Sequence, residues 1–100
     1  MSIAKLNILD KGVDLSRIGI NDYAYSWENI DDILAEIKKL NLTILGGDIY
    51  TIKDGELILT FDNWYYNQSN SNSSIVKARE YLYDYLEKNE GNFYFSLVFK

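Results

Sequence analysis

Two carboxylates lie in a stretch that otherwise has the composition of β-strands. Asp48 follows the paired glycines Gly46 and Gly47, and Asp62 comes later in the same stretch. Diagonal neighbours on one face of a sheet lie roughly 7–8 Å apart, so the two carboxylates could serve as acid and base or hold a divalent cation. No second motif supplies a nucleophile or a substrate clamp. A small carboxylate-dependent hydrolase is therefore the alternative hypothesis.

The residues that the chain lacks exclude most common enzyme chemistry. It has no His and no Cys, so it has no thiol nucleophile, no Ser-His dyad, no imidazole base and no ordinary zinc site. It also lacks a phosphate-binding glycine loop, a calcium-binding loop and the glycine-flanked serine turn of hydrolases. We therefore expect no catalytic residues, no metal and no cofactor.

Length and charge indicate one acidic domain over residues 1–100. The chain has 15 acidic and 10 basic residues, a formal net charge of -5. This balance argues against nucleic acid or an anionic membrane as partner, because both require a basic surface, and it suits a basic protein. Asp31 and Asp32 lie in a run, residues 21–37, that has no basic residue. No secretion signal or apolar stretch of about 20 residues is present, so we expect a soluble cytoplasmic protein.

Hydrophobic spacing predicts two main helices and three strands. Apolar residues recur at helical spacing from Ile30 to Leu40, after Ser26, a residue suited to cap a helix. Alternating apolar residues predict the strands. The predicted elements are a short helix over residues 3–10, an irregular stretch over 11–25, helices over 26–40 and 75–89, strands over 42–52, 56–62 and 92–99, and a polar, unpacked loop over 67–74.

The hairpin between the first two strands is predicted to have a three-residue loop. Lys53, Asp54 and Gly55 would form this loop, with Gly55 in the left-handed conformation and Ile52 opposite Glu56. That register places Leu57, Leu59 and Phe61 on the core face. A two-residue loop would send Asp48 inward beside Phe61, at a cost of several kcal/mol for a buried carboxylate, so we reject it.

Connection lengths then predict the topology. The fold is expected to be α+β, a three-stranded antiparallel sheet in the order 2-1-3 with both main helices on one face. The alternating leucines and phenylalanines would form the core beneath the helices. The face left open is expected to carry Asp48, Tyr50, Ile58, Thr60, Asp62, Tyr94, Ser96 and Val98.

Two short motifs carry a resemblance to a known family. They are Leu-Gly-Gly-Asp-Ile-Tyr, ending at Tyr50, and Thr-Phe-Asp-Asn-Trp-Tyr, from Thr60 to Tyr65, after a helix that begins near Trp27. Together they resemble the immunity protein 40 family of bacterial polymorphic toxin systems, over residues 25–66. The resemblance implies a small α+β protein that is made beside a secreted toxin domain and protects the producing cell by binding it. It does not indicate the toxin's activity.

We therefore predict an immunity protein that acts by binding, with a regulatory adaptor as a further alternative. Its partner would be a basic cognate toxin domain; the sequence leaves the oligomeric state open. Acidic and aromatic side chains are predicted to form the contact surface: Asp48, Tyr50, Asp62, Trp64 and Tyr66 on the open face, with Asp31 and Asp32 on the helix. Structural roles are predicted for Trp27, Gly46, Gly47 and Gly55. Gly46 and Gly47 would permit a bulge or the close approach of a ring, either Trp64 or one from the partner. Trp64 could instead fill the edge of the core.

Overall fold

The described strands form one antiparallel sheet in the order β1-β2-β5-β3-β4. The computed structural model describes residues 12–14 and 23–100. Along the chain the elements are β1 (Gly12–Asp14), β2 (Tyr23–Ser26), the 3-10 turn η4 (Trp27–Asn29), α1 (Ile30–Lys39), β3 (Ile44–Lys53), β4 (Glu56–Tyr65), α2 (Ser71–Lys88) and β5 (Phe93–Phe99). The helix predicted over residues 3–10 lies outside the described residues.

The α+β class is confirmed, whereas the extent of the predicted sheet is wrong. The three predicted strands are neighbours as expected, with β3 between β4 and β5. The sheet continues beyond β5, because β2 pairs with β5 and β1 pairs with β2. Residues in the stretch predicted to be irregular therefore form two strands. These strands are too short to show a clear alternation in sequence.

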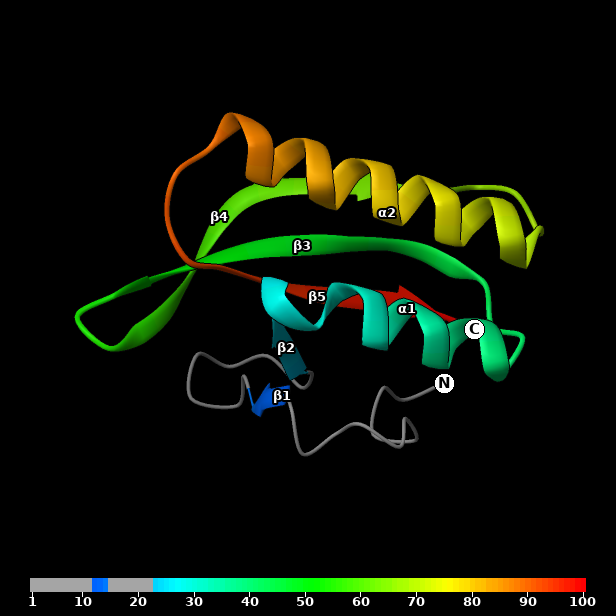
Figure 1. Cartoon of the computed structure of the whole chain (residues 1–100), viewed down its shortest axis with the longest axis horizontal. Helices are drawn as coiled ribbons and strands as arrows, with labels where there is room; N and C mark the ends of the chain where they lie inside the picture. The colour runs from blue at the N-terminus through cyan, green and yellow to red at the C-terminus, as the bar shows by residue number, and fades with distance from the viewer. Residues whose placement is uncertain (1–11, 15–22) are drawn as a thin grey trace.

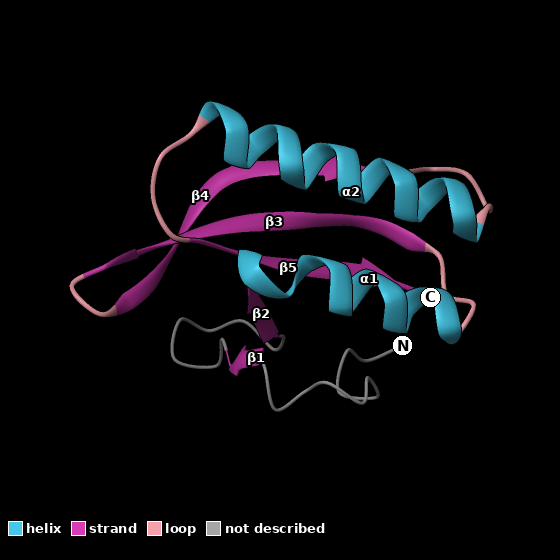
Figure 2. Ribbon diagram, in the orientation of Figure 1, coloured by secondary structure: helices cyan, strands magenta, loops and turns pink. Residues whose placement is uncertain are grey.

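Both helices cover the same face of this sheet and lie side by side (Figures 1 and 2). The spacing that predicted α1 is explained by its buried side chains: Ile30, Ile33, Leu34 and Ile37. Ser26 caps η4, the 3-10 turn that precedes α1, where its hydroxyl accepts a hydrogen bond from the Glu28 N–H at 3.4 Å. In the described part of the chain, neither helix combines the length and apolar character that crossing a membrane requires.

The polar run before α2 is part of the packed structure, which corrects the prediction of an unpacked loop over 67–74. Asn70 caps the helix by accepting a hydrogen bond from the Ser73 N–H at 2.8 Å, so α2 begins at Ser71. The Ser71 hydroxyl donates to the Leu42 carbonyl at 2.6 Å. The buried Ser74 hydroxyl accepts from the Ile44 N–H at 2.9 Å and donates to the Ser71 carbonyl at 2.7 Å. Serine hydroxyls thus join the start of α2 to the start of β3.

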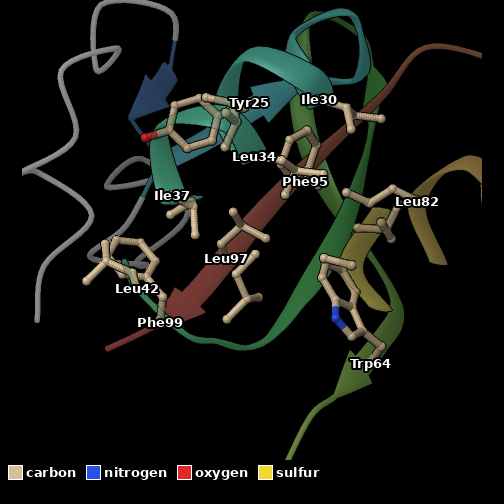
Figure 3. Packing of buried hydrophobic residues seen from close by; sticks show 14 of the residues in the cluster. Tyr25, Ile30, Leu34, Ile37, Leu42, Trp64, Leu82, Phe95, Leu97 and Phe99 are labelled. Atoms are coloured by element: carbon tan, nitrogen blue, oxygen red, sulfur yellow. The ribbon is translucent and has the colours of Figure 1, made fainter. Parts of the chain in front are cut away.

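The main core lies between the two helices and the sheet (Figure 3). The face predicted for β5 is confirmed, since its alternate residues are buried there: Phe93, Phe95, Leu97 and Phe99. The face predicted for β4 is wrong. Leu57 and Leu59 pack instead with Tyr50 and Ala24 in a second cluster, and Phe61 is exposed.

The hairpin turn explains this error. Lys53 pairs with Glu56, so the loop contains only Asp54 and Gly55. Both have positive φ, 53° and 80°, as a two-residue type I′ turn requires, and Asp-Gly is a preferred sequence for that turn. The three-residue loop that we predicted is therefore wrong, and the rejected two-residue loop forms.

A bulge in β4 removes the objection to the shorter loop. Tyr50 pairs with Leu59, but Asp48 pairs with Asn63, so residues 60–62 stand opposite Ile49 alone. Beyond the bulge the two strands have a different register. Phe61 points into solvent, and Asp48 is only partly buried. The penalty that we assigned to a buried carboxylate beside a phenylalanine therefore does not arise.

We expect Ser74→Ala to destabilise the protein. The substitution leaves the buried Ile44 N–H without its acceptor, and an unsatisfied buried donor costs about 1–3 kcal/mol. Urea unfolding should show that loss. Ser73→Ala is the matched control, because Ser73 is exposed in the same turn, and its effect should stay within about 0.5 kcal/mol. Equal midpoints for the two variants would contradict the role given to Ser74.

Candidate functional site

The paired glycines make room for the indole ring of Trp64. A Cβ atom on Gly47 would lie 2.5 Å from Cη2 and 2.8 Å from Cζ3 of that ring, and would also overlap the Ser96 carbonyl oxygen. Gly46 has a φ of 153°, and a Cβ there would overlap the Trp64 carbonyl oxygen. No side chain fits at either position without movement of the backbone. The sequence left open whether Trp64 or a ring of the partner approaches the glycines, and the structure shows that it is Trp64.

Trp64 is part of the core and lies against α2 (Figure 3). Its side chain is 4% exposed and stacks on Tyr81, with ring centroids 4.8 Å apart. The series of rings continues from Tyr81 to Tyr85 and then to Phe93, where the last two centroids are 5.0 Å apart. Within the described structure its indole N–H has no hydrogen-bond partner, so ring packing is what holds Trp64 in place. Trp64 therefore belongs to the core edge and not to an exposed face.

Tyr50 is also buried, on the face of the sheet opposite the helices. It is 1% exposed, packs with Ala24 and Leu59, and its hydroxyl lies 3.4 Å from Ser96 Oγ. The open aromatic face that we predicted around Tyr50 is therefore not formed. A partner cannot contact Tyr50 or Trp64 without displacing packed side chains.

The bulge separates Asp62 from Asp48. Asp62 accepts a hydrogen bond from the Tyr85 hydroxyl of α2 at 2.7 Å, so its carboxylate points toward the helix layer. Asp48 pairs across the sheet with Ser96 and shares the other face with Tyr50. The alternation that put both carboxylates on one face does not continue through the bulge. They are not the diagonal pair that the hydrolase hypothesis requires.

The remaining predicted contact residues lie in two different places, the segment after β4 and helix α1. Tyr66 follows β4, and its hydroxyl donates to the Asn70 carbonyl at 3.2 Å. Asp31 forms an ion pair with Arg79 of α2 at 2.5 Å and accepts from the Tyr83 hydroxyl at 3.0 Å. Exposed Asp32 follows Asp31 on α1. Arg79 therefore offsets part of the negative charge that the sequence assigned to this helix.

Two structural predictions concern the turn and the start of the helix layer. Gly55 occupies the second position of the β3–β4 turn, with a φ of 80° and open space where a Cβ would be. Trp27 is partly exposed in η4 and lines a small apolar pocket together with Leu86 and Phe93.

The two carboxylates nevertheless contribute to one negative field at the edge formed by β4 and α2. Burial raises the pKa of the Tyr81 hydroxyl, and the negative charges of Asp62 and Asp48 raise it further. The pKa of the Tyr85 hydroxyl is also raised, mainly by burial and to a smaller extent by its hydrogen bond to Asp62. Partial burial also raises the pKa of Asp48 itself. Both carboxylates thus lie close enough to Tyr81 to raise the pKa of its hydroxyl.

Two aromatic side chains that were not predicted to be exposed lie on the edge strand β4. Phe61 is 80% exposed and Tyr65 is 79% exposed, whereas alternation placed Phe61 in the core. Phe61 also has a φ of 71°, a conformation that is unusual for a bulky residue. The signal that could have revealed it was the Asp-Gly pair, since a two-residue turn shifts the register of β4.

Exposed rings and carboxylates share the β4 edge of the sheet. In the part of the chain that the structure describes, no three acidic side chains gather in a way that could hold a metal ion. The surface offers exposed rings and negative charge, a combination that suits contact with another protein.

The chain belongs to the immunity protein 40 family, whose model matches residues 14–99. This match extends well beyond the two motifs that suggested the family. Comparison with curated proteins and with solved structures gave no match.

We expect Gly47→Ala to destabilise the fold strongly. The new methyl group meets the Trp64 ring and a backbone carbonyl, so the cost should be near the upper end of the about 1–3 kcal/mol typical of overpacking. Chemical unfolding followed by tryptophan fluorescence measures it. Gly55→Ala is the control, since it introduces an unfavourable φ but no clash and should cost about 1 kcal/mol. A smaller loss for Gly47→Ala than for Gly55→Ala would contradict the packing described.

Proposed function

We propose that this protein binds and neutralises a co-encoded toxin domain. The observation that carries the proposal is the family match over residues 14–99. The surface supports it, because its exposed rings and carboxylates suit contact with a protein partner. Immunity of this kind requires binding and no chemical step. We place this binding in the cytoplasm of the producing cell.

The charge of the surface supports a basic partner. Asp48 and Asp62 both act on Tyr81 of α2 with their negative charge. Two further acids, Asp31 and Asp32, lie on α1, which packs against α2. A toxin that acts on nucleic acid needs a basic substrate groove. An acidic protein seated over that groove would block the substrate, and complementary charge would accelerate its association.

The carboxylate-dependent hydrolase is the less favoured alternative. It needs Asp48 and Asp62 at one reaction centre, but Asp62 accepts from Tyr85 on the helix side and Asp48 lies with Tyr50 on the other face. No specific observation favours a regulatory adaptor. Neutralisation of a toxin is therefore the function we propose.

Co-expression tests this function directly. The toxin domain encoded immediately upstream is induced in a susceptible bacterial strain with or without this protein, and the two purified chains are mixed for size-exclusion chromatography. We expect growth to be rescued and a stable complex to form. An active toxin that neither binds this protein nor loses its toxicity would contradict the proposal.

We expect the toxin to associate quickly and in a salt-sensitive manner. Screening weakens the attraction between exposed charges, so higher ionic strength should slow association much more than it changes dissociation. At low salt, Asp48→Asn and Asp62→Asn should each slow association roughly two- to fivefold, as expected when a steering charge is removed. Stopped-flow fluorescence measures these rates.

Glu28→Gln provides the matched control, because Glu28 is an exposed acid on η4, away from β4 in the strand order. Its association rate should fall less than that of either aspartate variant. If Glu28→Gln slowed association and the two aspartate variants did not, the contact surface would lie on the α1 side. Rates independent of salt would mean that charge does not guide the encounter.

A further inference from the structure

The β4 bulge places a large apolar side chain in water. Residues 60–62 stand opposite Ile49 alone, and at the middle of this segment Phe61 is 80% exposed with a φ of 71°. Both features are unfavourable for phenylalanine, since its ring is not buried and its backbone conformation is one that glycine or asparagine adopts more easily. Backbone outliers that the surrounding structure enforces are concentrated at functional sites.

Neighbouring side chains hold the bulge, and the ring of Phe61 is not among them. The Thr60 hydroxyl donates to the Ile49 carbonyl at 2.9 Å and accepts from the Asp62 N–H at 3.2 Å. The Asp62 carboxylate is held in turn by the Tyr85 hydroxyl at 2.7 Å. Both flanks of Phe61 are therefore fixed by side chains that are polar. The conformation that displays the ring does not depend on the ring.

The hairpin that carries Phe61 also has a second exposed aromatic residue and several acidic residues. Tyr65 lies further along β4 and is 79% exposed. The acids of the hairpin, Asp54 and Glu56, join Asp62, and the single basic residue there is Lys53. Exposed rings on a strand that also carries acidic residues suit contact with a partner of opposite charge.

We propose that Phe61 is the principal anchor for the toxin domain, inserted into an apolar pocket of a basic surface, with Tyr65 and Asp62 of the same strand as further contacts. This inference rests on the proposed function and identifies its central contact. Side chains make the contact, because the bulge interrupts the row of backbone groups that strand addition would need. The charges argue against a second copy of the chain, since pairing along β4 would bring like acidic residues together.

Two substitutions separate binding from folding. Phe61→Asn and Phe61→Gly remove the ring but suit a positive φ, so the melting temperature should stay the same or rise by a few degrees. Affinity for the purified upstream-encoded toxin domain, measured by biolayer interferometry, should fall at least tenfold, mainly through faster dissociation. Leu40→Ala is the control, because Leu40 is an exposed apolar residue at the end of α1, and its affinity should match the wild type.

The outcomes distinguish this inference from the proposed function. If the wild type binds the toxin and both Phe61 variants bind equally well, the anchor is wrong and the function stands. If both variants lose binding together with several degrees of stability, the ring supports the fold and the inference is also wrong. If the wild type does not bind the toxin, the proposed function fails and the partner named here fails with it. Wild-type protein that sediments as a dimer, with monomeric Phe61 variants, would assign the ring to self-association and overturn the proposal.

Discussion

The contact between the Trp64 ring and Gly47 fixes the register of the two longest strands at one end. The Asp-Gly turn fixes it at the other end, because a type I′ turn sets Lys53 opposite Glu56. These two constraints require different registers, so β4 contains more residues between them than β3. The surplus forms the bulge at residues 60–62. The position of Phe61 and the direction of Asp62 both follow from that mismatch.

The same contact connects the sheet to the helix layer. Trp64 stacks on Tyr81, Tyr81 on Tyr85, and Tyr85 meets the edge of Phe93, so one series of rings joins β4, α2 and β5. Serine hydroxyls at the start of α2 bind the backbone that leads into β3. The helix is thereby held at its start and along its C-terminal half, where Tyr85 also binds Asp62 of the bulge. A rigid support allows an exposed ring to meet a partner with little loss of conformational entropy on binding.

Features that follow a regular hydrophobic spacing were predicted correctly, whereas the turn and the bulge, which interrupt that spacing, were not. The stripe of α1, the buried face of β5 and the position of β3 between β4 and β5 follow from spacing and connection length. Alternation shows that Leu57 and Leu59 share one face of β4, but it does not show whether that face meets the helices. The length of the hairpin turn decides this. The bulge then broke the parity that had grouped Asp62 with Asp48. The serine run seemed too polar to pack because hydrophobicity does not count hydroxyls that satisfy buried backbone groups.

We propose that the bulged edge of β4 is where the protein meets its toxin, and hydrogen exchange of the complex tests this contact most directly. The amides of residues 60–66 are compared between the free protein and a saturated complex with the upstream-encoded toxin domain. We expect exchange at these amides to slow on binding, while the C-terminal end of α1 stays unchanged. Protection confined to α1 or β2, with residues 60–66 exchanging as in the free protein, would contradict the account.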